Sequence, residues 1–278
     1  MRGEADLVLE ALSGGGLLAV NVMFLAYLGV TLWVFHRLFL SKGRRRFTIL
    51  RPVGWDIWLP ILVFSAFILL SLLPAAPAFS GQLEENPVPF LLLAGLAQIL
   101  ACAIGWWCAS KVEMEPVALV LGLEIMRIPM GLIWAGIGLL LCVAPYLLAS
   151  GVAYGLSNVL GLPVEEQPLV DLFRRNLDNP AWPVFFLTAA VIAPVAEEIM
   201  FRGFLYRALV NWTGHRWLPI GVSGLIFSLF HFHFLALLPL WVVGAVAAAV
   251  YERSGNLWAA IFFHAGFNTV QVLVMMYL

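Results

Sequence analysis

The chain has 278 residues, of which 63% are hydrophobic and only 11% are charged, and its mean hydropathy is +0.97. This composition excludes a soluble domain and indicates a polytopic membrane protein. The formal net charge of −1 provides no basic surface for a polyanion, so nucleic acid is not expected as a partner.

Long apolar segments follow one another along most of the sequence. About 20 consecutive apolar residues cross the hydrocarbon core of a bilayer, and eight candidates predict an all-α fold, a bundle of about eight transmembrane helices. The candidate spans cover residues 16–40, 57–73, 89–109, 131–158, 182–210, 217–235, 237–251 and 257–278. The turn between the sixth and seventh spans is expected near Leu238 and Pro239, and the short apolar stretch 116–125 is expected in the membrane interface.

Lysines and arginines set the expected orientation. The densest basic cluster follows the first span and comprises Lys42, Arg44, Arg45, Arg46 and Arg51. Because cytoplasmic loops carry an excess of Lys and Arg, the loops after odd-numbered spans are predicted to be cytoplasmic and both termini to lie outside. The chain is therefore expected to be a multi-pass protein of the plasma membrane.

Polar residues are unevenly distributed among the predicted spans, because nearly all of the intramembrane chemistry lies in the second half of the chain. Residues 1–130 are therefore predicted to be supporting transmembrane helices, and residues 131–278 the working bundle. No internal repeat is visible, so an inverted-repeat transporter gains no support. The three cysteines (Cys102, Cys108 and Cys142) stand in apolar runs without CxxC spacing, and are interpreted as core residues.

Two carboxylates and an arginine interrupt the apolar stretch 191–209. A charged side chain near the centre of a membrane helix costs roughly 2.5–3.5 kcal/mol, so these groups must pair or face a polar cavity. Glu198 and Arg202 are one helical turn apart and can pair with each other. Glu197 points about 100° away from Glu198, which favours a catalytic cavity; the alternative is a structural ion pair beside a buried, protonated glutamate.

Two later spans carry histidines. Phe227 precedes His231 by four residues in the sixth span. His264 precedes Asn268 by four residues in the eighth, so that His264 and Asn268 share a helix face. On a continuous helix His233 would point about 200° away from His231. His233 is therefore interpreted as a hydrogen-bonding residue of the bundle.

These three spans supply the groups that amide hydrolysis requires, namely a base to activate water and donors to stabilise the oxyanion. Glu197 could activate a water that His231 holds, while His264 and Asn268 could donate to the oxyanion. No G-x-S-x-G elbow is present and no cysteine has a charged neighbour, so a serine or cysteine nucleophile is disfavoured.

In these motifs the sequence resembles the CPBP intramembrane proteases, which include CAAX prenyl endopeptidases and bacteriocin-processing or bacteriocin-immunity proteins. The family motif E-E-x-x-x-R matches Glu197, Glu198 and Arg202, F-x-x-x-H matches Phe227 and His231, and H-x-x-x-N matches His264 and Asn268. The resemblance covers residues 182–278. It implies an eight-helix endopeptidase with a cavity open toward the cytoplasm, in which Glu197 and His231 activate water and His264 and Asn268 form the oxyanion site.

The resemblance leaves the cofactor and the exact activity open. Glu197, His231 and His264 could ligate zinc, but no HExxH motif is present and Asn268 suits an oxyanion donor better, so metal-independent chemistry is favoured. The expected substrate is a membrane-associated or lipid-anchored peptide or protein, met at the lipid bilayer. The alternatives are a proton-coupled transporter and a non-catalytic immunity or binding member of the family.

Overall fold

The computed structural model describes residues 15–40, 50–72, 88–162, 170, 174 and 182–277, and these contain helices but no strand. The chain divides into two units, residues 1–46 and 47–278. In the first unit, α2 (Gly15–Phe35) continues into a short π-helical segment at His36–Leu40.

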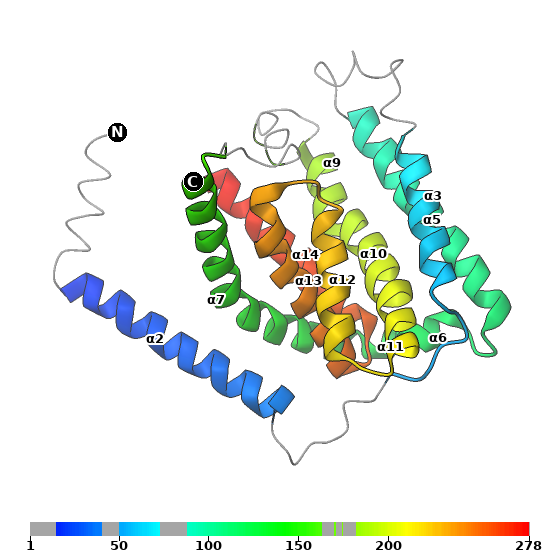
Figure 1. Cartoon of the computed structure of the whole chain (residues 1–278), viewed down its shortest axis with the longest axis horizontal. Coiled ribbons are helices and arrows are strands. Elements are labelled where there is room, and N and C mark those ends of the chain that lie inside the picture. The colour runs from blue at the N-terminus through cyan, green and yellow to red at the C-terminus, as the bar shows by residue number, and fades with distance from the viewer. Residues whose placement is uncertain are drawn as a thin grey trace. The chain divides into compact units, whose positions relative to one another are not determined.

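The second unit is a helical bundle (Figure 1). It begins with α3 (Trp58–Ser71), α5 (Val88–Val112), the short α6 (Val117–Leu121) and the long α7 (Ile128–Leu160). A composite helix over Trp182–Thr213 follows, made of α9 (Trp182–Leu187), η3 (Thr188–Ile192), α10 (Ala193–Glu198), η4 (Ile199–Tyr206) and α11 (Arg207–Thr213). The chain ends with α12 (Trp217–Leu229), α13 (Phe234–Ser254) and α14 (Leu257–Tyr277).

The predicted membrane architecture is confirmed. Five of the described helices are long and apolar enough to span a membrane, and three shorter apolar helices accompany them. Each of the eight predicted spans corresponds to one of these helices. The short apolar stretch before α7 contains α6, which ends at Gly122, where φ is +74°.

One boundary was predicted wrongly, because α12 ends at Leu229 and α13 begins at Phe234. The turn therefore lies at residues 230–233, and Pro239 is inside α13. Pro239 is the sixth residue of α13, past the first four residues whose N–H groups have no intrahelical partner, so α13 lacks one internal hydrogen bond at this proline. The side chain of His233 supplies the missing start signal, because its Nδ1 accepts a hydrogen bond from the backbone N–H of Ala236 at 3.2 Å.

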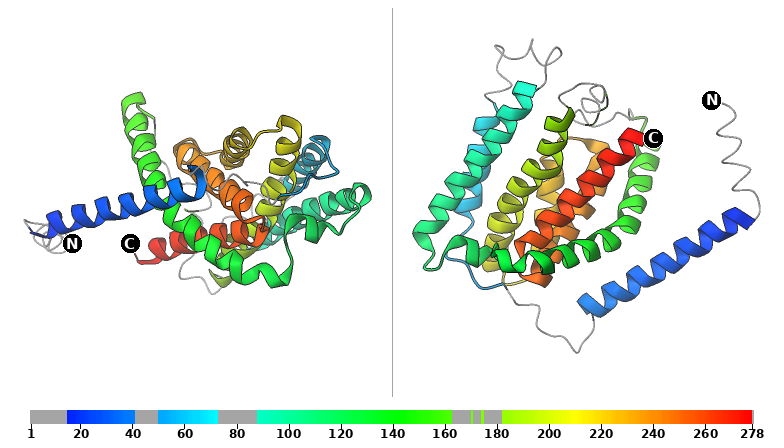
Figure 2. Two further views of the ribbon diagram at one scale, coloured as in Figure 1. Left: turned by 90° about the horizontal axis from the view of Figure 1, so that it is seen from below. Right: turned by 180° about the vertical axis from the view of Figure 1, so that it is seen from behind.

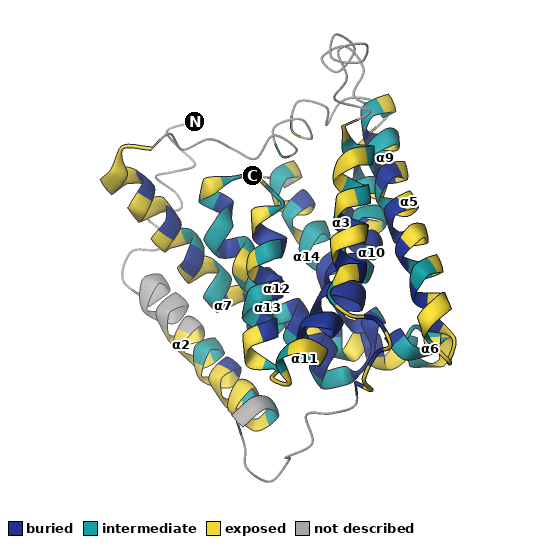
Figure 3. Cartoon of the chain, turned by 45° about the vertical axis from the view of Figure 1, so that its right-hand side comes forward, coloured by how far each residue is buried: buried dark blue, intermediate teal, exposed yellow. Residues whose placement is uncertain are grey.

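The helices pack in two groups that meet at the composite helix. In the front view of Figure 1 and the rear view of Figure 2, α3 and α5 lie side by side, while α7, α12, α13 and α14 lie on the other side of α10. Buried residues gather where α10 and η4 meet α12 and α13, and exposed apolar residues cover the outward faces of α3 and α5 (Figure 3). This distribution suits a bundle whose outer faces contact lipid.

Two glycines let α12 and α13 approach each other closely. A Cβ atom added to Gly224 would lie 2.7 Å from the backbone nitrogen of Ala245, and one added to Gly244 would lie 2.7 Å from the Cα of Gly224. Both distances are too short for any side chain. The two backbones therefore touch, as small residues permit at membrane helix interfaces.

Candidate active site

The candidate site is centred on Glu198, whose side chain is completely buried. Its Oε1 accepts hydrogen bonds from Arg202 (Nη1, 2.9 Å) and from His264 (Nδ1, 2.8 Å). The predicted pair between Glu198 and Arg202 is therefore present. The bond from His264 could not be predicted, because it joins α14 to α10 across the bundle.

Arg202 is also completely buried, and its charge is shared among several partners. Its Nη2 donates to the carbonyl oxygen of Gly244 in α13 at 2.8 Å. Its guanidinium carbon lies 4.7 Å from the ring centroid of Phe227, within the range of a cation–π interaction. Arg202 thereby joins the composite helix to both α12 and α13.

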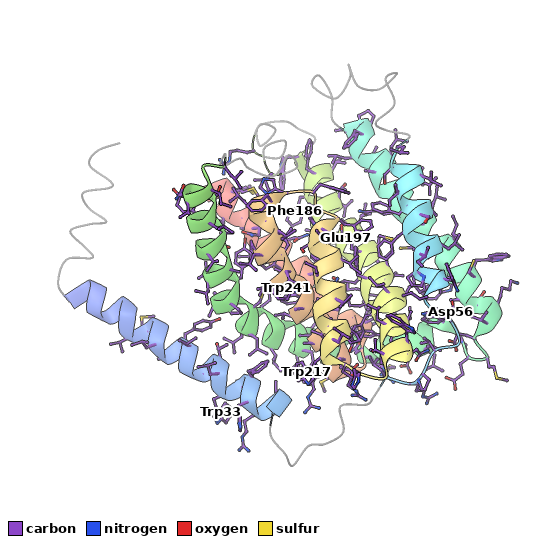
Figure 4. The ribbon with its side chains drawn as sticks, viewed as in Figure 1. Trp33, Asp56, Phe186, Glu197, Trp217 and Trp241 are labelled. Carbon is purple, nitrogen blue, oxygen red and sulfur yellow. The ribbon has the colours of Figure 1, made fainter. Side chains whose placement is uncertain are left out.

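Glu197 occupies a more open position than its neighbour. Figure 4 shows it midway along the composite helix, and 17% of its side chain is exposed, whereas none of Glu198 is. Its Oε2 lies 3.9 Å from Nε2 of His264, and its Oε1 accepts from Nε2 of Gln98 at 3.5 Å. The imidazole of His264 therefore lies between two adjacent carboxylates, one on each ring nitrogen.

Phe227 joins the two motif histidines. Its ring centroid lies 4.8 Å from that of His231 and 5.4 Å from that of His264. The Nδ1 of His231 lies 2.9 Å from the carbonyl oxygen of Phe227. Because a carbonyl can only accept, Nδ1 carries the proton in this bond, and Nε2 of a neutral His231 is then an acceptor.

Asn268 forms a hydrogen bond to the π-helical segment of the composite helix. Its Nδ2 donates to the carbonyl oxygen of Ala189 at 2.8 Å. In a regular α-helix this carbonyl would accept from the N–H of Ala193, but that N–H donates to the carbonyl oxygen of Thr188 instead. In a π-helix the donor would be residue 194, which is a proline and has no N–H. Since the amide nitrogen has two N–H groups, Asn268 keeps one further donor.

The structure thus brings together Glu197, Glu198, Arg202 and His264, with Phe227 packed between His264 and His231. Among the described residues, the polar and ring contacts of His231 are with Phe227 and not with Glu197. The helical argument that separated His231 from His233 was wrong, because α12 ends before both residues. His233 instead caps α13.

The zinc alternative requires three ligands that converge. Within the described part of the chain, no three His, Cys, Asp or Glu side chains form such a group. Glu197 and His264 lie close enough to share an ion, but among the described residues His231 does not join them in a group that could hold one. The predicted ligands therefore do not form a zinc site in this arrangement, and metal-independent chemistry stays a prediction.

Sequence reasoning missed one residue beside the site and one separate buried cluster. Gln98 was recognisable only as a polar residue in an apolar helix. The cluster comprises Glu252, whose oxygens accept from Tyr206 (2.8 Å) and Arg216 (2.5 Å), and Arg207, whose Nη1 donates to Tyr251. Its members lie near the ends of the predicted spans, where charged residues are common.

Part of the chain matches a known protein family. Residues 179–270 match the family model described as type II CAAX prenyl endopeptidase Rce1-like, and this segment contains all seven motif residues. The resemblance to the CPBP family is confirmed. At the level of this family, the chain is similar to CAAX-type membrane peptidases.

Relatives extend the similarity beyond the matched segment. The "Putative membrane peptidase YdiL" of Bacillus subtilis (strain 168) is 24% identical over 230 residues, which are 82% of this chain and 91% of the relative. "UPF0177 protein YbdI" of Lactococcus lactis subsp. lactis (strain IL1403) is 34% identical over 98 residues, 34% of this chain and 50% of that protein. No solved structure matches the chain significantly.

Proposed function

We propose that the protein is an intramembrane endopeptidase that hydrolyses a peptide bond in a membrane-associated or lipid-anchored peptide or protein. The observation that carries the proposal is the position of His264, with its Nδ1 on Glu198 and its Nε2 facing Glu197. A purely structural ion pair between Glu198 and Arg202 would not require this second carboxylate. The CPBP resemblance supports the same reaction class.

In the proposed reaction Glu197 is the general base. It removes a proton from water as the water oxygen bonds to the scissile carbonyl carbon, and the carbonyl π electrons move onto oxygen. Nε2 of His231 is proposed to hold that water by accepting a hydrogen bond from its other O–H group. When the C–N bond breaks, the proton on Glu197 passes to the leaving nitrogen, which restores the base.

His264 and Asn268 are the proposed oxyanion donors. With His264 protonated on both nitrogens, the cations of His264 and Arg202 balance the anions of Glu197 and Glu198. Nε2–H of His264 and the second N–H of Asn268 would then stabilise the oxyanion, which is the usual task of fixed donors in a water-poor site. Glu198 orients the imidazole through Nδ1.

The decisive experiment offers membrane-anchored peptides to the purified protein in lipid vesicles and identifies products by mass spectrometry. Glu197→Gln should lower turnover about 10²–10⁴-fold, the usual effect of removing a general base. Glu252→Gln is the matched control, because it makes the same change at a buried carboxylate outside the site. Equal turnover by wild type and Glu197→Gln would refute the hydrolytic role, and binding without any product would favour the immunity or binding alternative.

The reaction is proposed to need no metal. Activity should survive dialysis against a strong zinc chelator, because the proposed roles use only the side chains of Glu197, His231, His264 and Asn268. Loss of activity on chelation, restored by one equivalent of Zn²⁺, would make Glu197, His231 and His264 ligands instead.

The site is proposed to open toward the cytoplasm from the plasma membrane. This orientation follows from the basic residues after the first span. A topology reporter fused after Leu278 should lie on the opposite side of the membrane from one inserted at Gly43. Reporters on the same side would contradict the orientation.

A further inference from the structure

A glutamine from the N-terminal half of the chain contacts the proposed base. Gln98 lies in α5, outside the segment that matches the family model. Its Nε2 donates to Oε1 of Glu197 at 3.5 Å, while the other oxygen of Glu197 faces His264. The two oxygens of the base are therefore directed to different helices.

Gln98 belongs to the face of α5 that docks on the composite helix. One turn along this face, the thiol of Cys102 donates to the carbonyl oxygen of Ala196 at 3.3 Å. One turn in the other direction, a Cβ added to Gly95 would lie 3.5 Å from the Cγ2 of Ile192, which is an ordinary contact distance. Contacts on both sides of Gln98 thus hold its backbone beside Glu197.

Within the described residues, the nitrogen of the Gln98 amide has a hydrogen-bond partner and the oxygen has none. Its Oε1 is buried and has no hydrogen-bond partner among the described residues. An unsatisfied buried acceptor destabilises the folded state, because it has given up its hydrogen bonds to water. Reversing the amide would place this oxygen against a carboxylate oxygen, which is also an acceptor. An apolar side chain would avoid this cost, so stability alone does not explain a glutamine here.

We propose that Gln98 is a positioning residue that holds the carboxylate of Glu197 with Oε2 toward His264. The proposal rests on the proposed function of Glu197 as the base. A hydrogen bond of 3.5 Å is long, and catalytic hydrogen bonds are often long before substrate is bound. Gln98 restricts rotation of the carboxylate and thereby aligns it with the water that it activates.

The first test is Gln98→Met, which keeps the length of the side chain and removes both polar atoms. We expect kcat to fall about 10-fold or more with little change in KM, since a misplacement of about 1 Å can cost about 10²-fold in rate. The thermal midpoint in detergent should stay unchanged or rise, because the unsatisfied acceptor is removed. Gln98→His, which keeps a ring N–H donor, should recover part of kcat.

Gln271→Met is the matched control. Gln271 is another partly buried glutamine of the bundle, and its Nε2 donates to the hydroxyl of Tyr146 at 2.7 Å. Its loss should lower the thermal midpoint and leave kcat near the wild-type value. This pattern is the opposite of that expected for Gln98→Met.

A double variant separates positioning from general damage. If Gln98 acts through Glu197, adding Gln98→Met to Glu197→Gln should cause no further loss of turnover. The proposal is overturned if Gln98→Met retains the wild-type kcat. It is also overturned if the double variant loses turnover by the product of the two single losses and has a lower thermal midpoint than Glu197→Gln.

A cross-linking experiment tests the contact between Gln98 and Glu197 without measuring turnover. With the three native cysteines replaced by alanine, Gln98→Cys and Glu197→Cys together should be joined by a bifunctional thiol reagent long enough to span the two native side chains, whose ends meet in the structure. No cross-link would overturn the contact and the positioning role, even in an active enzyme. A cross-link in a chain whose wild type cleaves no peptide would instead overturn the proposed function, and with it any role of Gln98 in catalysis.

Discussion

Two buried glutamates of this protein have different surroundings. Glu252 in α13 is almost fully buried, and each of its oxygens accepts a hydrogen bond, from Tyr206 and from Arg216. Glu198 is fully buried as well, but both of its hydrogen bonds reach the same oxygen, and its Oε2 has no partner among the described residues. Satisfied networks stabilise a fold, whereas an unsatisfied buried group in a native structure calls for another explanation.

Glu197 has weaker polar contacts than either of these buried glutamates. Its two polar contacts are at 3.5 and 3.9 Å, longer than those of either buried glutamate. Arg202 also keeps a buried Nε that has no hydrogen-bond partner in the described part of the chain. The cluster around His264 therefore carries unmet hydrogen-bonding capacity that the cluster around Glu252 lacks, as expected if the first performs chemistry and the second holds helices together.

The largest effect is expected from breaking the more completely buried ion pair. Arg202→Met should lower the free energy of unfolding by about 3–5 kcal/mol, because it leaves the charge of Glu198 buried without its arginine. Glu197→Ala should lower it much less, since that carboxylate is partly exposed. Denaturation in mixed micelles measures both variants, and equal losses would argue against a structural pair between Glu198 and Arg202.

Arg216→Met is the control in the other cluster. Arg216 is 26% exposed, and Glu252 would keep its bond from Tyr206. The loss of unfolding free energy should therefore be smaller than for Arg202→Met. A larger loss would reverse the distinction between the two clusters.

The next largest effect is expected on kcat, when a proposed oxyanion donor is removed. Asn268→Ala should lower kcat roughly 10²–10³-fold with little change in KM, since a bond to the oxyanion strengthens only in the transition state. Thr269→Val is its neighbour control, because the Thr269 hydroxyl donates to the carbonyl oxygen of Ala265 in its own helix. A rise in KM with kcat unchanged would show that Asn268 only holds Ala189.

The smallest effect on turnover is expected at the cap of α13. His233→Ala removes one capping bond and should cost about 1 kcal/mol in stability, as for other caps. Turnover should stay near wild type, whereas His231→Ala should lower it strongly. The opposite result in steady-state assays would mean that the wrong histidine was assigned to the site.

The sequence predicted features that depend on local spacing or on total hydropathy. All eight apolar helices were located, and the pair between Glu198 and Arg202 followed from their separation by four residues. The turn before α13 was misplaced because its residues lack glycine and proline. Phe232 alone among the described non-glycine residues has a positive φ, of 49°, and no sequence rule foresees this.

Contacts between helices could not be predicted. The bond from His264 to Glu198 and the approach of Gln98 to Glu197 both depend on how separate helices are rotated and packed. The π-helical segment near Ala189 also depends on Asn268, which is almost 80 residues later in the sequence. Hydropathy determines which helices form, but it does not determine which polar atoms meet.

Gly244 is expected to tolerate substitution poorly, although it is uncharged and lies in none of the motifs. Its missing side chain allows α12 to touch α13, and its carbonyl oxygen receives Arg202. Any substitution would push away Gly224 and displace this acceptor at the same time. In a deep mutational scan, position 244 should therefore tolerate alanine as poorly as it tolerates leucine, whereas the outward face of α5 should accept most apolar replacements.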